Sequence, residues 1–147
     1  MKHSTLSSSP NSGNTFVSGI LQRTLKYRVW DVSNQRMVYS PYLFEPKPDY
    51  LDNPEPYRFY ETWQDVEDGI GRLCYVMEYI GANDKNGKEI YVGDLLKSEN
   101  QADEIQPISI DLFHGVRFMV GKNNFTRADA AYGEVLGNVF ENPELLG

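Results

Sequence analysis

Apolar and polar side chains alternate along residues 25–30, the first strongly patterned part of the chain. Apolar residues occupy the odd positions of this segment, while Lys26, Arg28 and Trp30 occupy the even ones. A two-residue period is typical of a β-strand. Residues 31–35 are rich in turn-forming side chains, and residues 37–39 read as a return strand. The pattern therefore predicts an N-terminal β-hairpin.

A second extended segment covers residues 73–80, where both alternating faces are largely apolar. This pattern indicates a central, well-buried strand in which Cys74 is a small and inert core residue. Further short strands are predicted at 89–91, 95–97, 105–113, 116–121 and 134–140. Several short strands separated by turn residues are typical of a small barrel or sandwich.

Two Thr-x-x-Asp tetrads have the spacing of helix N-caps. Thr62 and Asp65 predict a short helix over 62–68, which Gly69 would end. Thr126 and Asp129 predict a single helical turn before the last strand. The expected fold is therefore mainly β, with one or two short helices.

Turn residues predict how the strands of the second half connect. Asn86 and Gly87 form a strong signal for a tight reversal. Gly93 can take a positive φ and place a bulge where a strand bends, and Asp94 would accept hydrogen bonds from backbone donors of that corner.

Residues 40–57 hold five of the eight prolines, which excludes a helix or a central strand there. The segment is predicted to be a long ordered loop or a mobile arm. Its aromatic side chains either form a second small core or serve as a contact patch, because such side chains bury much area at low entropic cost. If they serve in contact, the predicted interaction surface consists of Tyr27, Trp30, Tyr42, Phe44, Tyr50 and Tyr57.

Charge divides the chain into a tail and a body. The sequence has 147 residues with 14 Lys and Arg against 21 Asp and Glu, a net charge of −7. Residues 1–23 are rich in Ser, carry only Lys2 and Arg23 as charged residues, and are predicted to be a tail. Residues 24–147 then hold 12 basic and 21 acidic residues, a net charge of −9. The opposite signs favour docking of the tail on its own body or on a second copy.

Composition excludes several classes of protein. One Cys cannot form an internal disulfide, and one Cys with two His cannot supply the four or so ligands of a structural zinc site. No apolar run approaches the roughly 20 residues of a membrane helix, and the N-terminus lacks the apolar stretch of an export signal. A negative body also argues against tracking along a nucleic-acid backbone.

Three groups of residues were weighed as carriers of chemistry, and each has a simpler structural interpretation. The carboxylates within 65–68 lack the continuing ligand pattern of a calcium loop, which favours a solvated turn. Residues 85–88 lack the surroundings of a phosphate-binding loop, which favours a hairpin tip. His114 lies in a predicted turn, and no nucleophile can be placed beside it. We therefore predict no catalytic residue, no metal ligand, no cofactor and no small-molecule substrate.

Three segments resemble the YopX family of bacteriophage and prophage proteins. The run from Tyr79 to Leu96 looks like the signature segment of that family, and the run from Glu134 to Leu146 looks like its C-terminal segment. Residues 27–31 and 36–39 are similar to its N-terminal hairpin. The resemblance covers about residues 24–147 and leaves the tail outside.

The resemblance implies a mainly β protein, with an N-terminal β-hairpin extension and an SH3-like barrel or roll in the C-terminal half, over residues 72–147. It implies a phage-encoded protein expressed in the cytoplasm of a bacterium. It implies no established activity, so no functional residue can be transferred to this chain.

Three functions remain open from sequence. The first is a non-enzymatic accessory module that binds a protein or itself through aromatic surface and sheet edges. The second is an acidic mimic of nucleic acid that inhibits a host DNA-binding protein. The third is direct nucleic-acid binding on the first hairpin, where Trp30 would stack on bases beside Lys26, Arg28 and Arg36.

Overall fold

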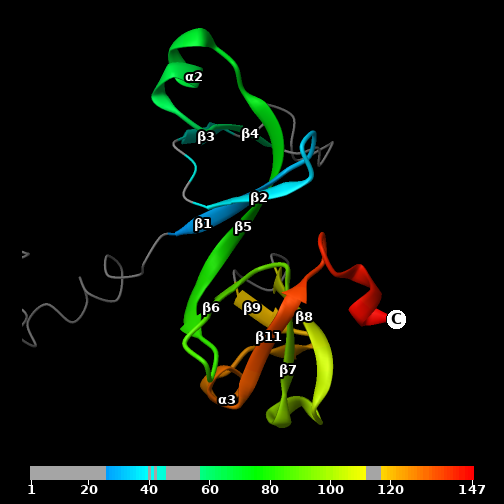
Figure 1. The fold of residues 1–147 in the computed structure, drawn as a ribbon. Coiled ribbons are helices and arrows are strands. Elements are labelled where there is room, and N and C mark those ends of the chain that lie inside the picture. The colour runs from blue at the N-terminus through cyan, green and yellow to red at the C-terminus, as the bar shows by residue number, and fades with distance from the viewer. Residues whose placement is uncertain (1–25, 40, 42, 46–56, 112–116) are drawn as a thin grey trace, which may run out of the picture.

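A computed structural model describes residues 26–39, 41, 43–45, 57–111 and 117–147. Within these residues the fold is mainly β, as predicted, and consists of two antiparallel sheets with short helices at their ends (Figure 1). The predicted tail and His114 lie outside the described residues. No helix in the described part is long and apolar enough to cross a membrane.

The first sheet is built around β5 (Arg72–Asn83), the long strand that runs down the centre of Figure 1. Its strands follow the order β2, β1, β5, β4 and β3, and β6 pairs with the far end of β5. The bounds are β1 Tyr27–Asp31, β2 Arg36–Tyr39, β3 Leu43–Glu45, β4 Tyr57–Tyr60 and β6 Glu89–Tyr91. The predicted N-terminal hairpin is confirmed, because β1 and β2 pair antiparallel from Arg28 and Tyr39 to Asp31 and Arg36.

The second sheet contains β10, β9, β8, β7 and β11 in that order. The bounds are β7 Asp94–Ser98, β8 Glu104–Asp111, β9 Arg117–Val120, β10 Asn123–Asn124 and β11 Gly133–Asn138. This sheet curls into a half-barrel in the lower half of Figure 1, which confirms the SH3-like barrel or roll expected there. Two 3-10 turns complete it, η3 (Glu99–Gln101) and η4 (Pro143–Leu146).

Among the described residues, buried side chains form three clusters. The barrel core consists of Ile90, Leu96, Ile108, Val120, Ala130 and Val135. A second core lies on one face of the first sheet and consists of Val29, Val38, Phe59 and Cys74. Trp30, Met77 and Tyr91 form a third cluster between the two sheets. The second core shows that aromatic residues just beyond the proline segment do pack inward, since Phe59 is completely buried.

Both predicted helices are present. Helix α2 (Trp63–Asp68) begins where the Thr62 hydroxyl accepts a hydrogen bond from the Asp65 backbone N–H at 3.1 Å, and it ends at Gly69 with φ +69°. Helix α3 (Arg127–Ala131) begins at a capping box made by Thr126 and Asp129. The Thr-x-x-Asp spacing therefore located both helix starts.

The corner between β6 and β7 has the predicted positive φ and the predicted Asp94 hydrogen bond. Gly93 has φ +98°, and the Asp94 carboxylate accepts a hydrogen bond from the Tyr91 backbone N–H at 2.8 Å. The register shift of the barrel, however, lies in β11 between Val135 and Gly137. A Cβ on Gly137 would stand 2.3 Å from the Asn142 side-chain oxygen, so glycine permits this close approach.

Two expectations for the first sheet were wrong. The sequence did not predict strands β3 and β4. The prolines of residues 40–57 indicated a loop, but β3 is a three-residue strand at the edge of the sheet, where nearby prolines are tolerated, and β4 pairs with it. The first half of β5 is not buried on both faces, since Leu73 is 37% and Tyr75 is 43% exposed. Tyr75 stacks on Phe140 at 5.4 Å at the edge of the third cluster but keeps part of its ring exposed, so the apolar run exceeds what is fully buried.

A buried ion pair joins the two sheets. Arg28 of β1 donates a hydrogen bond to the Asp94 carboxylate of β7 at 2.6 Å, and both residues are at most 2% exposed. The guanidinium also lies over the Tyr91 ring, 4.6 Å from its centroid. Trp30 stacks on Phe140 beyond β11 at 5.2 Å, so the N-terminal hairpin is fastened to the barrel by charge and by aromatic contact.

Candidate functional site

Three residues of the predicted aromatic surface have described side chains: Tyr27, Trp30 and Tyr57. Trp30 is only 6% exposed and belongs to the cluster between the sheets, so its assignment to an interaction surface is wrong. Tyr27 and Tyr57 are half-buried and pack against the second core. Tyr42 and Tyr50 lie outside the described residues, and so does the side chain of Phe44, whose backbone belongs to β3.

The cations of the first hairpin are already paired inside the protein. Arg28 is buried against Asp94, and Lys26 is bonded to Glu89. Arg36 holds the Glu61 carboxylate through two nitrogens at 2.7 and 3.0 Å and also contacts Asp31. Trp30 and Arg28 are buried, whereas the Lys26 and Arg36 side chains stay 42% and 39% exposed but are each bonded to a carboxylate, so the stacking ring and cations expected there are not free together.

The tip at residues 85–88 is a hairpin turn, as predicted. The Asp84 carboxylate accepts hydrogen bonds from the backbone N–H groups of Asn86 and Lys88, at 2.8 and 2.9 Å. Gly87 has φ +84° and closes the turn. Since an internal carboxylate takes these two backbone donors, they are not available to a phosphate.

Cys74 and the carboxylates of α2 show no reactive arrangement among the described residues. Cys74 is fully buried, and burial raises the pKa of its thiol to about 12. The carboxylates of α2 lie on a helix without buried residues, which agrees with a solvated acidic turn. Across the described residues there is no group of three or more His, Cys, Asp or Glu placed to hold a metal ion.

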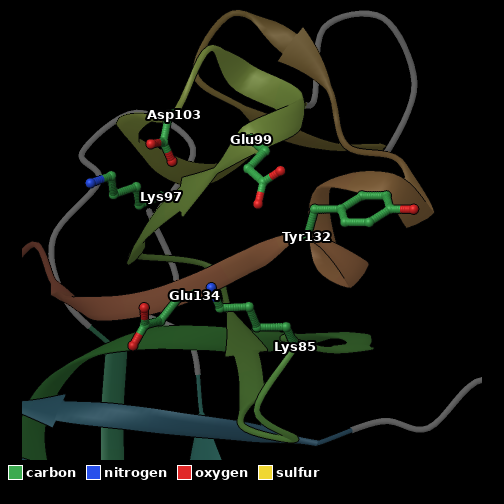
Figure 2. Close-up of a pocket in the computed structure, with 6 residues that line it drawn as sticks. All are labelled: Lys85, Lys97, Glu99, Asp103, Tyr132 and Glu134. Atoms are coloured by element: carbon green, nitrogen blue, oxygen red, sulfur yellow. The ribbon is translucent and has the colours of Figure 1, made fainter.

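A polar cleft on the barrel is the strongest candidate site, and sequence reasoning did not find it. It has a volume of about 310 Å³, and six residues line it: Lys85, Lys97, Glu99, Asp103, Tyr132 and Glu134. Figure 2 shows Glu99 and Asp103 on one side of the hollow, Tyr132 at its end, and Lys85 with Glu134 across from them. The six residues come from the hairpin tip, β7, η3 and the turn after it, the end of α3, and β11.

Buried carboxylates hold the walls of the cleft in place. Asp84 accepts a hydrogen bond from the Val135 backbone N–H at 2.8 Å, and the Lys85 N–H donates to the Gly133 carbonyl at 2.9 Å. These bonds attach the hairpin tip to β11. On the opposite side, Asp129 of α3 accepts hydrogen bonds from the side-chain amides of Asn100 and Gln101 in η3, at 2.7 and 2.8 Å.

The backbone at the rim of the cleft is strained. Ala102 and Asp103 have φ values of +57° and +58°, two consecutive non-glycine residues in the left-handed region. Each such residue costs roughly 1–2 kcal/mol, and strain of this kind concentrates at functional sites. The strained turn carries Asp103 to the cleft, where its carboxylate lines the hollow.

We expect Ala102→Gly to raise the free energy of unfolding by about 0.5–1 kcal/mol, measured by urea denaturation. The left-handed conformation costs glycine nothing, and this gain exceeds the entropy that glycine adds to the unfolded chain. Ala128→Gly, inside α3, is the matched control and should lower stability by about 1 kcal/mol. A loss of stability in both variants would contradict strain at Ala102.

The side chains that line the cleft are unpaired. None of the six makes a hydrogen bond or an ion pair with another side chain in the described part of the protein, and Tyr132 is 58% exposed. Elsewhere, Arg28, Arg36, Lys26 and Arg117 are each bonded to a carboxylate. Unpaired charges that converge on a hollow are suited to bind a polar ligand.

Comparisons with known proteins identify the family of this chain and a solved structure with a similar fold. A family model described as YopX protein matches residues 26–147. The fold is similar to the crystal structure of protein EF1440 from Enterococcus faecalis, with a TM-score of 0.55 and 23% sequence identity; the match covers 84% of this chain and 99% of that chain. No curated protein matches the sequence. At this identity the structural likeness extends to the fold alone.

Proposed function

Because the chain belongs to the YopX family, we propose that it is a phage- or prophage-encoded accessory protein that catalyses no reaction and acts in the bacterial cytoplasm by binding another protein or a second copy of itself. The observation that supports this proposal is the cleft, where six polar side chains that make no side-chain hydrogen bond or ion pair within the described residues line one hollow. Tyr132 adds exposed aromatic area, and tyrosine is among the residues that contribute most to binding at protein interfaces.

The placement of the acidic residues favours this function over mimicry of nucleic acid. A mimic needs carboxylates displayed on the surface, but Asp31, Asp84, Asp94 and Asp129 are at most 6% exposed. Glu61, Glu89 and Asp111 are paired with basic side chains. Seven of the 21 acidic residues are therefore buried or paired with basic side chains and are not free to mimic phosphates.

The test compares the wild-type chain with Tyr132→Ala combined with Glu99→Gln. Each immobilised protein is exposed to the same bacterial lysate, and retained proteins are quantified by mass spectrometry. Self-association is measured in parallel by sedimentation. We expect the double variant to lose at least tenfold of a specific partner, or to shift an oligomer to monomer, since a central tyrosine contributes about 2 kcal/mol or more.

The control is Tyr39→Ala with Glu67→Gln, which removes an exposed tyrosine and an exposed carboxylate outside the cleft. It should retain the partner or the oligomer. The proposal is wrong if the cleft variant and the control behave alike in both measurements.

A further inference from the structure

We propose that the cleft accepts a lysine or arginine side chain from an extended segment of the partner protein, held between the Tyr132 ring and the carboxylates of Glu99 and Asp103. This inference rests on the proposed function and adds the chemistry of the ligand. It depends on three features of the cleft: the charges that line it, the backbone groups around it, and its size.

The charge of the lining favours a cation. Three carboxylates and two ammonium groups line the cleft, so its formal charge is −1. Figure 2 shows the ammonium group of Lys97 directed away from Tyr132, while the carboxyl groups of Glu99 and Asp103 are directed towards the hollow. Of these carboxylates, Glu99 is the one on the side of the cleft where Tyr132 lies, while Asp103 lies above Lys97.

Tyr132 provides the second element of cation recognition. The Glu99 backbone N–H lies 3.4 Å from the Tyr132 carbonyl, so the two residues are neighbours across the junction of η3 and α3. An ammonium or guanidinium group near a tyrosine face is attracted by the negative face of the ring. A carboxylate beside the same ring adds a charge-assisted hydrogen bond.

The backbone around the cleft disfavours an anion. The N–H groups of Asn86 and Lys88 at the hairpin tip donate to Asp84, and the Val135 N–H donates to the same carboxylate. The Lys85 N–H donates to Gly133. Anion sites in turns depend on such backbone donors, and here they are already occupied.

The size of the hollow suits one long side chain. At about 310 Å³ it is at the lower limit of small-molecule clefts, and its lining side chains are polar or charged apart from the Tyr132 ring. An apolar anchor would gain little burial there. The net charge of −9 on residues 24–147 would also attract a basic segment from a distance and speed its association.

The test begins with a display library of random nine-residue peptides, selected on the immobilised full-length chain. We expect Lys or Arg to be enriched at one position of the selected peptides. In solution, replacing that residue by Gln in the best peptide should weaken its Kd at least tenfold. Raising the salt concentration from 50 to 300 mM should weaken the wild-type complex severalfold, because charge attraction is screened.

Protein variants separate the cleft from the general charge of the molecule. Glu99→Gln with Asp103→Asn should weaken peptide binding at least tenfold. Glu67→Gln with Glu144→Gln removes the same charge from two exposed positions outside the cleft and should change Kd less than twofold. Lys97→Gln should leave binding unchanged or strengthen it, whereas weaker binding would indicate an anionic ligand.

Each outcome decides between the two proposals. Peptides that depend on Tyr132 but show no basic preference would overturn this inference and leave the proposed function standing. Peptides whose affinity is the same for the wild-type chain and every cleft variant would overturn both. If the library yields no binder, the basic side chain is rejected, and the proposed function is decided by the lysate and sedimentation measurements.

Discussion

Replacing Arg28 with methionine is expected to lower the free energy of unfolding by about 3–5 kcal/mol. The variant keeps most of the side-chain volume but leaves the Asp94 carboxylate, which is 1% exposed, without its cation. Breaking a buried ion pair at one end has this cost because an uncompensated charge stays in a poorly solvated place. Urea denaturation followed by the fluorescence of buried Trp30 measures the loss.

Removing both charges should be less harmful than removing one. Asp94→Asn keeps an oxygen for the Tyr91 backbone N–H, so Arg28→Met with Asp94→Asn should recover most of the stability lost by Arg28→Met alone. The Arg28 Nε is buried without a hydrogen-bond partner among the described residues, so the native pair is itself imperfectly satisfied. We therefore expect the pair to contribute more to the specific docking of the hairpin than to net stability.

The pH dependence of the Arg28 variant follows from the Asp94 carboxyl. Burial raises the pKa of this group above its ordinary value, and the Arg28 guanidinium opposes that rise. Without Arg28 the pKa should rise further, so the folded variant binds a proton that the unfolded chain releases. The penalty should therefore be smaller near pH 4.5 than at pH 7.5.

Arg117→Met is the matched control for Arg28. Arg117 donates to Asp111 at 2.9 Å, but its side chain is 41% exposed. Exposed pairs contribute at most about 1 kcal/mol to stability, so the free energy of unfolding of this variant should be close to that of the wild type. Equal losses for Arg28→Met and Arg117→Met would contradict a special role of the buried pair.

Local pattern predicted the local parts of this fold. Alternation located the first hairpin, and cap spacing located both helices, because these signals depend on neighbours in sequence. The Arg28 and Asp94 pair joins residues 66 positions apart, and nothing in the alternation of β1 shows that its even face meets a barrel. The same cause misplaced Trp30, whose exposure depends on Phe140 at the other end of the chain.

The cleft was missed for a related reason. Its residues come from positions 85 to 134, and they meet through the register of β7 and β11, which pairs Lys97 with Glu134, and through the bonds of Asp84 and Lys85 to β11. The left-handed turn at Ala102 and Asp103 has no glycine to mark it. Lys85 was considered as part of a phosphate loop, but the role of Asp84 in filling that loop required the tertiary structure.

Replacing Asp129 with alanine is expected to cost about 3 kcal/mol of stability and to weaken the binding of basic peptides to the cleft. Asp129 is fully buried, and its two oxygens accept four hydrogen bonds, from Asn100, Gln101 and both the backbone N–H and the hydroxyl of Thr126. A hydrogen bond to a charged group contributes about 1.5–3 kcal/mol, and the total loss stays near the upper value because Asn100 and Thr126 are exposed and can bond water instead. These bonds also hold η3, which carries Glu99, against α3, which precedes Tyr132.

The acid dependence of stability provides an independent readout of Asp129. Burial opposes ionisation of this carboxyl, but the hydrogen bonds from Asn100, Gln101 and Thr126 outweigh it and lower its pKa. A carboxyl with a lowered pKa stabilises the folded state above its ordinary pKa of about 4, and this stabilisation is lost as the pH falls through the folded value. Asp129→Ala should therefore lose less stability than the wild type on acidification below pH 4.

Asp65 offers the matched control, because it occupies the same position of the Thr-x-x-Asp tetrad in α2. Its backbone N–H donates to Thr62, and its carboxylate makes no hydrogen bond within the described residues. Asp65→Ala should cost about 0.5 kcal/mol, the contribution of a negative charge near a helix N-terminus. The stability loss of Asp129→Asn should lie between these two values. Its single amide oxygen can accept hydrogen bonds either from η3 or from Thr126, but not from both. If Asp129→Ala and Asp65→Ala lower the free energy of unfolding equally, the carboxylate of Asp129 does not hold the cleft together. A larger loss for Asp129→Ala would show that its hydrogen bonds to η3 stabilise the fold beyond the effect of a helix-terminal charge.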